Sequence, residues 1–113
     1  MRALVGGAVA GVVLAVAWPV FAQPQDQLAH GKQVFQYWCA TCHGAGPGHP
    51  GTDALQAKYH GAQPALLEDR TDLKPETVRF FVRHGVTVMP FFRKTEISDA
   101  DLDAIGAYLA RRR

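Results

Sequence analysis

Two cysteines and a histidine stand together in one short string, Cys39-Ala40-Thr41-Cys42-His43. At the end of a helix, Cys39 and Cys42 would lie one turn apart on one face. Each thiol can then add across one vinyl group of a haem, and His43 follows under the iron as its proximal ligand. The C-x-x-C-H spacing therefore predicts one covalently attached haem c, held by two thioether bonds.

Three other chemistries remain as alternatives for the cysteines. A thioredoxin-like dithiol normally opens a helix after a strand, and no strand is predicted before Cys39. A structural zinc site needs two more ligands, for which His49 and His60 are available without a second C-x-x-C. A disulfide between Cys39 and Cys42 would be strained.

The sixth position of the iron is predicted to be filled by Met89, which lies in a loop and precedes Pro90. A thioether ligand shifts the reduction potential of the iron upward, which suits electron transfer. The alternatives are an open position or one of four histidines, His30, His49, His60 and His84. Otherwise, we expect His84 to cap the end of a helix, His30 to be an exposed helix residue, and His49 and His60 to be solvated.

The remaining haem environment can be outlined from residue types. The expected pocket wall is apolar and consists of Leu55, Leu66, Leu67, Val78, Phe81 and Val82. The carbonyl oxygen of Pro50, or that of Pro47, is expected to accept a hydrogen bond from the ring of His43. Candidate partners of the haem propionates are Tyr59, Arg70 and Arg93.

Helices are the elements that must position these residues. Apolar spacing predicts a helix over 26–38, and a second helix that starts at Pro75 and ends at Gly85. A third helix is capped by Ser98, with Asp101 completing a capping box. Residues 44–52 and 86–97 are expected to be loops. In a compact domain, loops of this length usually surround a bound group.

Length and composition limit the classes of protein to which the chain can belong. The chain has 113 residues, 48% of them apolar and 19% charged, which predicts one small domain and excludes wholesale disorder. A net charge of +2 does not point to nucleic acid, and two cysteines do not make a disulfide scaffold. The mixed charges of Glu68, Asp69 and Arg70 are expected to face water.

The first 22 residues read as a secretory signal peptide. Arg2 is followed by an apolar stretch from Ala3 to Val16, and cleavage is expected after Ala22. An uncleaved anchor is the alternative, but the stretch is shorter than the roughly 20 apolar residues that span a membrane. The haem-binding domain would then be residues 23–113, in the periplasm and without a membrane segment.

The chain resembles a class I cytochrome c. The motif from Cys39 to His43 with Met89, and the strings Gly31-x-x-x-Phe35 and Ile105-x-x-Tyr108-Leu109, carry the resemblance. It implies an all-α fold of three to four short helices and long loops around one haem. In that fold the first and last helices cross, and Gly31 lets their backbones approach.

A closer resemblance is to the cytochrome subunit of 4-cresol dehydrogenase (hydroxylating), also called p-cresol methylhydroxylase, and of eugenol hydroxylase. It is carried by three strings: Gly48-His49-Pro50-Gly51-Thr52, the stretch Pro64-Ala65-Leu66-Leu67-Glu68-Asp69-Arg70-Thr71-Asp72-Leu73, and Met89-Pro90-Phe91-Phe92-Arg93-Lys94-Thr95-Glu96. It implies a partner subunit with covalent FAD that oxidises 4-alkylphenols. The cytochrome would accept its electrons one at a time and pass them to a periplasmic acceptor such as a copper protein or another cytochrome.

The sequence therefore predicts a non-catalytic redox subunit rather than an enzyme. A free-standing electron shuttle in a respiratory chain is the alternative, and an enzyme or sensor with an open iron site is opposed by Met89. Transfer would be outer-sphere, through one exposed haem edge. The expected apolar rim of that edge is Ala45, Pro47, Met89, Pro90 and Phe92. Of the neighbours Phe91 and Phe92, we expect one to point inward and one outward.

Overall fold

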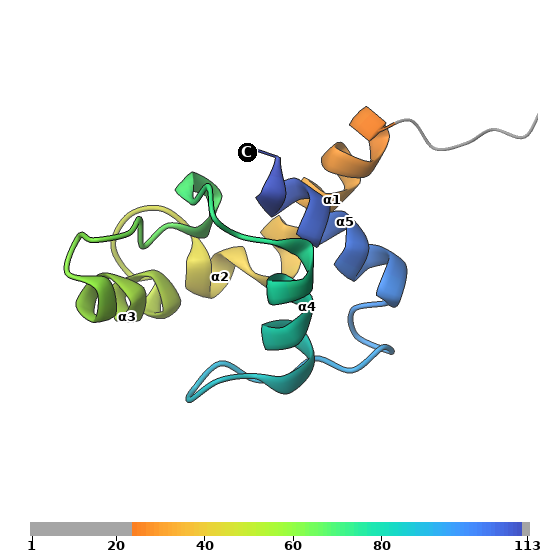
Figure 1. The fold of residues 1–113 in the computed structure, drawn as a ribbon. Coiled ribbons are helices and arrows are strands. Elements are labelled where there is room, and N and C mark those ends of the chain that lie inside the picture. Colours follow the sequence, from red (N-terminus) through yellow and green to blue (C-terminus); the bar gives the residue numbers. More distant parts are fainter. Residues whose placement is uncertain (1–23, 112–113) are drawn as a thin grey trace, which may run out of the picture.

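The computed structural model describes residues 24–111, which fold into helices joined by long connections (Figure 1). The elements are α1 (Pro24–Trp38), α2 (Ala40–His43), α3 (Pro50–Tyr59), the 3-10 helix η1 (Leu67–Asp69), α4 (Pro75–His84) and α5 (Asp99–Ala110). No strand forms within this part of the chain, so the predicted all-α class is confirmed. The expected signal peptide, residues 1–22, lies outside the described residues.

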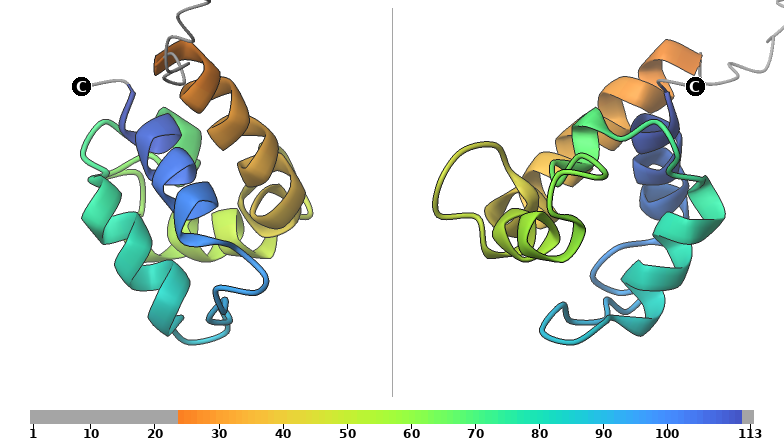
Figure 2. Two further views of the ribbon diagram at one scale, coloured as in Figure 1. Left: turned by 90° about the vertical axis from the view of Figure 1, so that its right-hand side faces the viewer. Right: turned by 60° about the vertical axis from the view of Figure 1, so that its left-hand side comes forward.

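Helices α1 and α5, the first and the last, cross in contact with each other (Figures 1 and 2). Gly31 makes the crossing close, because a Cβ there would collide with the carbonyl group of Ala104 and lie 2.9 Å from Tyr108 Cβ. The rings of Phe35 and Tyr108 meet at 5.8 Å between centroids, and Phe35 is fully buried. His30 Nε2 adds a polar contact across the crossing, 2.7 Å from Asp101 Oδ1. The predicted crossing is confirmed.

The core lies where α4 packs against this pair of helices. Its buried side chains are Phe35, Val78, Val82, Ile97, Leu102, Ile105, Tyr108 and Leu109. Burial of each such side chain is worth about 1.5–3 kcal/mol relative to exposure. The core is thus built by α1, α4 and α5, together with one residue from the segment before α5.

The helix ends follow the expected signals in most places. Pro75 occupies the first turn of α4, where a missing N–H costs nothing, and Gly85 ends the helix with a φ of 69°. Ser98 Oγ accepts a hydrogen bond from Asp101 N at 3.1 Å and caps α5. Helix α1 begins at Pro24, two residues before the expected start, since proline is also favourable in a first turn.

One element was wrongly predicted as a loop. The expected loop 44–52 ends at His49, because α3 begins at Pro50 with the proline in its first turn. The apolar pattern of α3 in the sequence is weak. In the structure only four of its residues are half-buried, namely Gly51, Thr52, Leu55 and Tyr59, and the rest are exposed. Three of these, Gly51, Leu55 and Tyr59, recur every four residues and so share one face. That face is the one that helps to line the cavity described below.

Candidate functional site

The C-x-x-C-H motif lies on a single helical turn that continues from α1. The Cys39 amide donates to the Phe35 carbonyl oxygen at 2.8 Å, and the His43 amide donates to the Cys39 carbonyl oxygen at 2.8 Å. Cys39 is half-buried, Cys42 is exposed, and no disulfide joins them. The two sulfurs therefore stand one turn apart as free thiols, as the prediction requires.

The surroundings of Cys39 disfavour its thiolate form. Burial, and after it the neighbouring Cys42, raises the pKa of Cys39 to about 12. A thioredoxin-like dithiol needs the opposite, a thiol whose pKa is lowered so that the thiolate forms near neutral pH. An apolar, uncharged environment suits a thioether sulfur, and the dithiol alternative is disfavoured.

His43 is half-buried, and its ring Nδ1 is not committed to a partner among residues 24–111. Its Nδ1 atom is fully buried and has no hydrogen-bond partner within the described residues. Burial also lowers the pKa of His43, so the imidazole is neutral at neutral pH, which is the form that binds metals. A half-buried, neutral imidazole whose Nδ1 has no partner among the described residues fits the role of an iron ligand.

Helix α3 packs directly on the ring of His43. A Cβ at position 51 would lie 2.7 Å from His43 Cε1 and 2.8 Å from the Cys42 carbonyl oxygen, so only glycine allows this approach. Thr52 Oγ1 donates to the Gly44 carbonyl oxygen at 2.9 Å and ties the helix to the motif. The expected hydrogen bond from His43 to Pro50 or Pro47 is not formed. Pro50 is the first residue of α3, and a carbonyl in a helix points along the helix axis.

A cavity of about 580 Å³ lies beside the motif, and its wall is mainly apolar. Ligand pockets usually measure about 300–1,000 Å³. All four predicted haem-binding residues line it, namely Cys39, Cys42, His43 and Met89. Figure 2 shows how α1, α3, α4 and the segment after α4 are arranged around the centre of the molecule.

Most of the expected wall residues line this cavity. Leu55, Leu67, Val78, Phe81 and Val82 are present in the wall. Leu66 is not, because it precedes η1 and only its neighbour Leu67 faces inward. Sequence reasoning missed Trp38, Ala54, Lys58 and Thr77, which also line the cavity. The spacing of Gly51, Leu55 and Tyr59 was the one signal from which the contribution of α3 could have been found.

Met89 reaches the cavity from the segment between α4 and α5. It is half-buried and packs against the core. A tight turn holds it, in which Val86 N donates to the Met89 carbonyl oxygen at 3.1 Å and Met89 N donates to the Val86 carbonyl oxygen at 2.9 Å. At the tip of this turn, Val88 is 92% exposed. The turn therefore directs one side chain outward and Met89 inward.

The four alternative histidines do not line the cavity. His30 contacts Asp101, and His84 Nδ1 lies 2.8 Å from the Phe80 carbonyl oxygen, as expected of a residue at a helix end. His60 is exposed, as expected. His49 is not simply solvated, since it is half-buried with Nδ1 3.1 Å from the Thr41 carbonyl oxygen. Within residues 24–111 no three His, Cys, Asp or Glu side chains form a metal-binding group, so the zinc alternative finds no ligand set.

Two of the three candidate propionate partners lie at the cavity. Tyr59 and Arg70 line it, and the Arg70 guanidinium stands 5.1 Å from the centre of the Tyr59 ring. Arg70 is only 7% exposed and donates to Asp72 at 2.8 and 2.5 Å, which raises its pKa above the ordinary value. Arg93 instead pairs with Glu96 at the surface.

The expectation that Glu68, Asp69 and Arg70 all face water is wrong. Arg70 is buried as described, and Glu68 accepts a hydrogen bond from the Tyr108 hydroxyl. The expected rim of the haem edge also needs a correction, because Phe92 points inward and packs edge-on against Trp38 at 5.8 Å. Its neighbour Phe91 is 61% exposed, so the two phenylalanines alternate as predicted.

These features define a small all-α domain with an apolar cavity beside a C-x-x-C-H motif, which is a class I c-type cytochrome domain. Residues 26–109 match the family model described as cytochrome c oxidase, cbb3-type, subunit III, and the chain belongs to this family. Its cofactor is therefore haem c, and its size is consistent with a single covalent haem. Neither the curated proteins nor the solved structures contain a significant match.

The family indicates how the domain works. The domain is of the haem-based electron-transfer type. Within residues 24–111, no helix has the length and apolar character needed to cross a bilayer.

Proposed function

We propose that Cys39 and Cys42 hold the haem through thioether bonds and that His43 and Met89 are its axial ligands. The observation that carries this proposal is that two sequence-distant segments bring these four side chains to one apolar cavity. Bound haem iron supplies a one-electron couple, and a methionine–histidine ligand pair sets it at a high potential.

The protein's own residues make this couple fast and selective. The wall of the cavity is mainly apolar, and the half-buried Met89 lines it. His43 and Met89, which would hold the iron, both belong to the folded chain, so neither would have to be exchanged when the haem changes its oxidation state. Little reorganisation then opposes electron transfer, and no site is left open for a substrate.

The electron donor in this proposal is a flavoprotein subunit that contains FAD and oxidises 4-alkylphenols of the p-cresol or eugenol type. The support is the resemblance of the strings around Pro50, Arg70 and Met89 to the cytochrome subunit of that enzyme class. The exposed rim beside Met89 offers an apolar contact surface, with Val86 46%, Val88 92% and Phe91 61% exposed. The chain would be exported, cleaved after Ala22, and would pass electrons to a periplasmic copper protein or cytochrome.

A free-standing carrier in a respiratory chain is the second candidate. The observation that favours the respiratory setting is the family description, which names a cytochrome c oxidase. Such a carrier would use the same haem and the same ligands. The two candidates differ only in the donor, so the donor is what must be measured.

The deciding experiment is purification of the untagged protein from its native periplasm, followed through its haem absorbance. The flavocytochrome proposal expects a second, larger chain with bound flavin in fixed stoichiometry, and reduction of the haem on addition of 4-cresol or eugenol. A lone cytochrome that only other redox proteins reduce would overturn that donor assignment and support the carrier. A mass without the haem increment would contradict both.

A further inference from the structure

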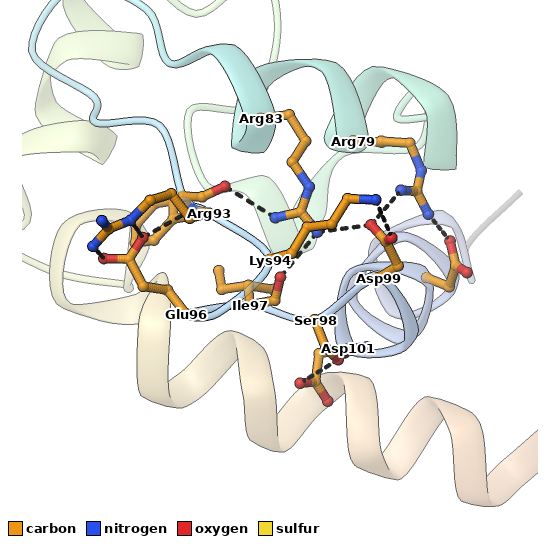
Figure 3. A network of polar contacts seen from close by, with 11 residues as sticks. Arg79, Arg83, Arg93, Lys94, Glu96, Ile97, Ser98, Asp99 and Asp101 are labelled. Carbon is orange, nitrogen blue, oxygen red and sulfur yellow. Dashed lines mark hydrogen bonds and ion pairs between the residues drawn. The ribbon is translucent and has the colours of Figure 1, made fainter.

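The side chain of Arg83 lies across the segment that connects Met89 to α5 (Figure 3). Its Nη1 donates to the Phe92 carbonyl oxygen at 3.0 Å, and its Nη2 donates to the Ile97 carbonyl oxygen at 2.9 Å. Nη2 also contacts Asp99 Oδ1 at 3.0 Å. One guanidinium group thus holds both ends of residues 92–97, and its side chain is only 16% exposed.

We propose that Arg83 is a positioning residue for Met89. By fixing residues 92–97 against α4, its guanidinium group keeps the Met89 sulfur at the haem iron. This inference rests on the proposed axial role of Met89. It assigns to Arg83 a part in holding Met89 in place against opening of the segment that carries it.

The segment needs such a tie because it has no helix or strand of its own. Between Gly85 and Ser98 its backbone is held to α4 by the Phe92 amide, which donates to the Val82 carbonyl oxygen at 2.7 Å, and by Arg83. Hydrogen bonds from a charged donor are roughly twice as strong as neutral ones. Loss of the donor would leave carbonyl groups in a partly buried place without a partner, which is costly.

The position of these ties along the chain connects them to Met89. Phe92 is three residues beyond Met89, so the two backbones stay within about 10 Å of each other at full extension. On the other side, the turn between Val86 and Met89 follows directly from the end of α4. Release of Phe92 and Ile97 would therefore let Met89 swing outward on that turn.

Arg79 provides a matched control on the same helix, one turn earlier. It pairs with Asp99 Oδ1 at 3.2 Å and with Asp103, so it shares the carboxylate that Arg83 contacts. Both contacts run to carboxylates on α5 and not to the backbone of residues 92–97. Arg79→Met removes one charge from this network but leaves the carbonyl ties in place.

The test is the affinity of ferric holoprotein for imidazole, which binds only when Met89 leaves the iron. We expect Arg83→Met to bind imidazole about tenfold more tightly than the wild type, equivalent to about 1.4 kcal/mol of easier opening. Arg79→Met should stay within about twofold of the wild type. Arg83→Lys keeps the charge but not the planar fork, so it should fall between Arg83→Met and the wild type.

Each result discriminates. Equal imidazole affinities of Arg83→Met and Arg79→Met would overturn the inference about Arg83. The assignment of Met89 as an iron ligand is tested separately, and it stands if Met89→Ala loses the sulfur-to-iron charge-transfer band of the wild type. Absence of that band from the wild type would overturn the ligand assignment and this inference with it. Should Arg83→Met fail to fold with haem, Arg83→Lys carries the test, and wild-type affinity in that variant overturns the inference.

Discussion

The two sides of the haem cavity are built in different ways. On one side, Cys39, Cys42 and His43 follow one another on a single helical turn, and their spacing along the chain determines their positions. On the other side, Met89 lies in a segment without regular structure, held by contacts from α4. The first side is a local motif and the second is a product of tertiary packing. Changes on the motif side should abolish attachment of the haem. Changes on the Met89 side should leave the haem attached and alter its spectrum and reduction potential.

The largest expected effect is on the motif side. Replacement of both Cys39 and Cys42 by alanine should abolish covalent attachment completely, because each thioether needs its own sulfur. Haem staining of a denaturing gel measures this, with Thr41→Ala, inside the same motif, as the control that should keep the stain. A stained band in the double variant would show that the motif does not carry the cofactor.

Replacement of Met89 by alanine should leave the haem attached but change its electronic properties. We expect loss of the sulfur-to-iron charge-transfer band and a fall in reduction potential on the order of 0.2 V, within the roughly 0.8 V range that axial ligands span. Val88→Ala is the control, because that side chain is 92% exposed in the same turn. An unchanged spectrum and potential in Met89→Ala would remove this residue from the ligand set.

The helix crossing supports both sides of the cavity, and Gly31 tests it. A leucine at position 31 would overlap the backbone of Ala104, and we expect a loss of unfolding free energy of about 3 kcal/mol, the upper end for overpacking. Denaturant unfolding of the holoprotein measures the loss. Gln33→Leu, exposed on the same helix, should change the midpoint little; equal effects of the two would argue against a tight crossing.

The smallest expected effect concerns the ion pairs beside Arg83. Lys94, and after it Arg83 and Arg79, hold the pKa of Asp99 well below its ordinary value of 3.8. A lowered pKa in the folded state means that this stabilisation is present at neutral pH and is lost as the pH falls below about 4 toward the lowered value.

Acid titration of the unfolding midpoint checks this sign. Asp99→Asn should therefore differ from the wild type at pH 7 and converge with it at low pH, and added salt should shrink the difference because the carboxylate is partly exposed. Asp103→Asn, which pairs only with Arg79 among the contacts described, is the control. A gap between Asp99→Asn and the wild type that widens in acid would contradict the assignment.

Residue patterns predicted the fold class because its signals are local. The caps at Ser98 and Gly85 and the proline at the start of α4 act within one turn of the helix they end or begin. Helix α3 was missed because its buried face is narrow and faces a cavity rather than a continuous core. Because α3 was missed, Pro50 was predicted to lie in a loop, and its carbonyl oxygen was expected to accept a hydrogen bond from His43.

Side-chain burial proved harder to predict from residue type. Arg70 was expected to face water with Glu68 and Asp69, yet it is buried at the cavity beside Tyr59. Phe92 was expected at the exposed rim, and its neighbour Phe91 is exposed instead. In both cases the choice between inside and outside depends on residues far away in the chain, such as Trp38 for Phe92.

The sequence by itself determined the attachment motif, the family's cofactor and the helical class, because these depend on spacings shorter than two turns of helix. Only the tertiary structure decided that His43 has a buried ring nitrogen without a partner among residues 24–111, that α3 packs on the ring through Gly51, and that Arg83 holds the segment after Met89. Those contacts join residues whose separation along the chain does not determine their distance in space. They form only when the core of α1, α4 and α5 brings the connecting segments together.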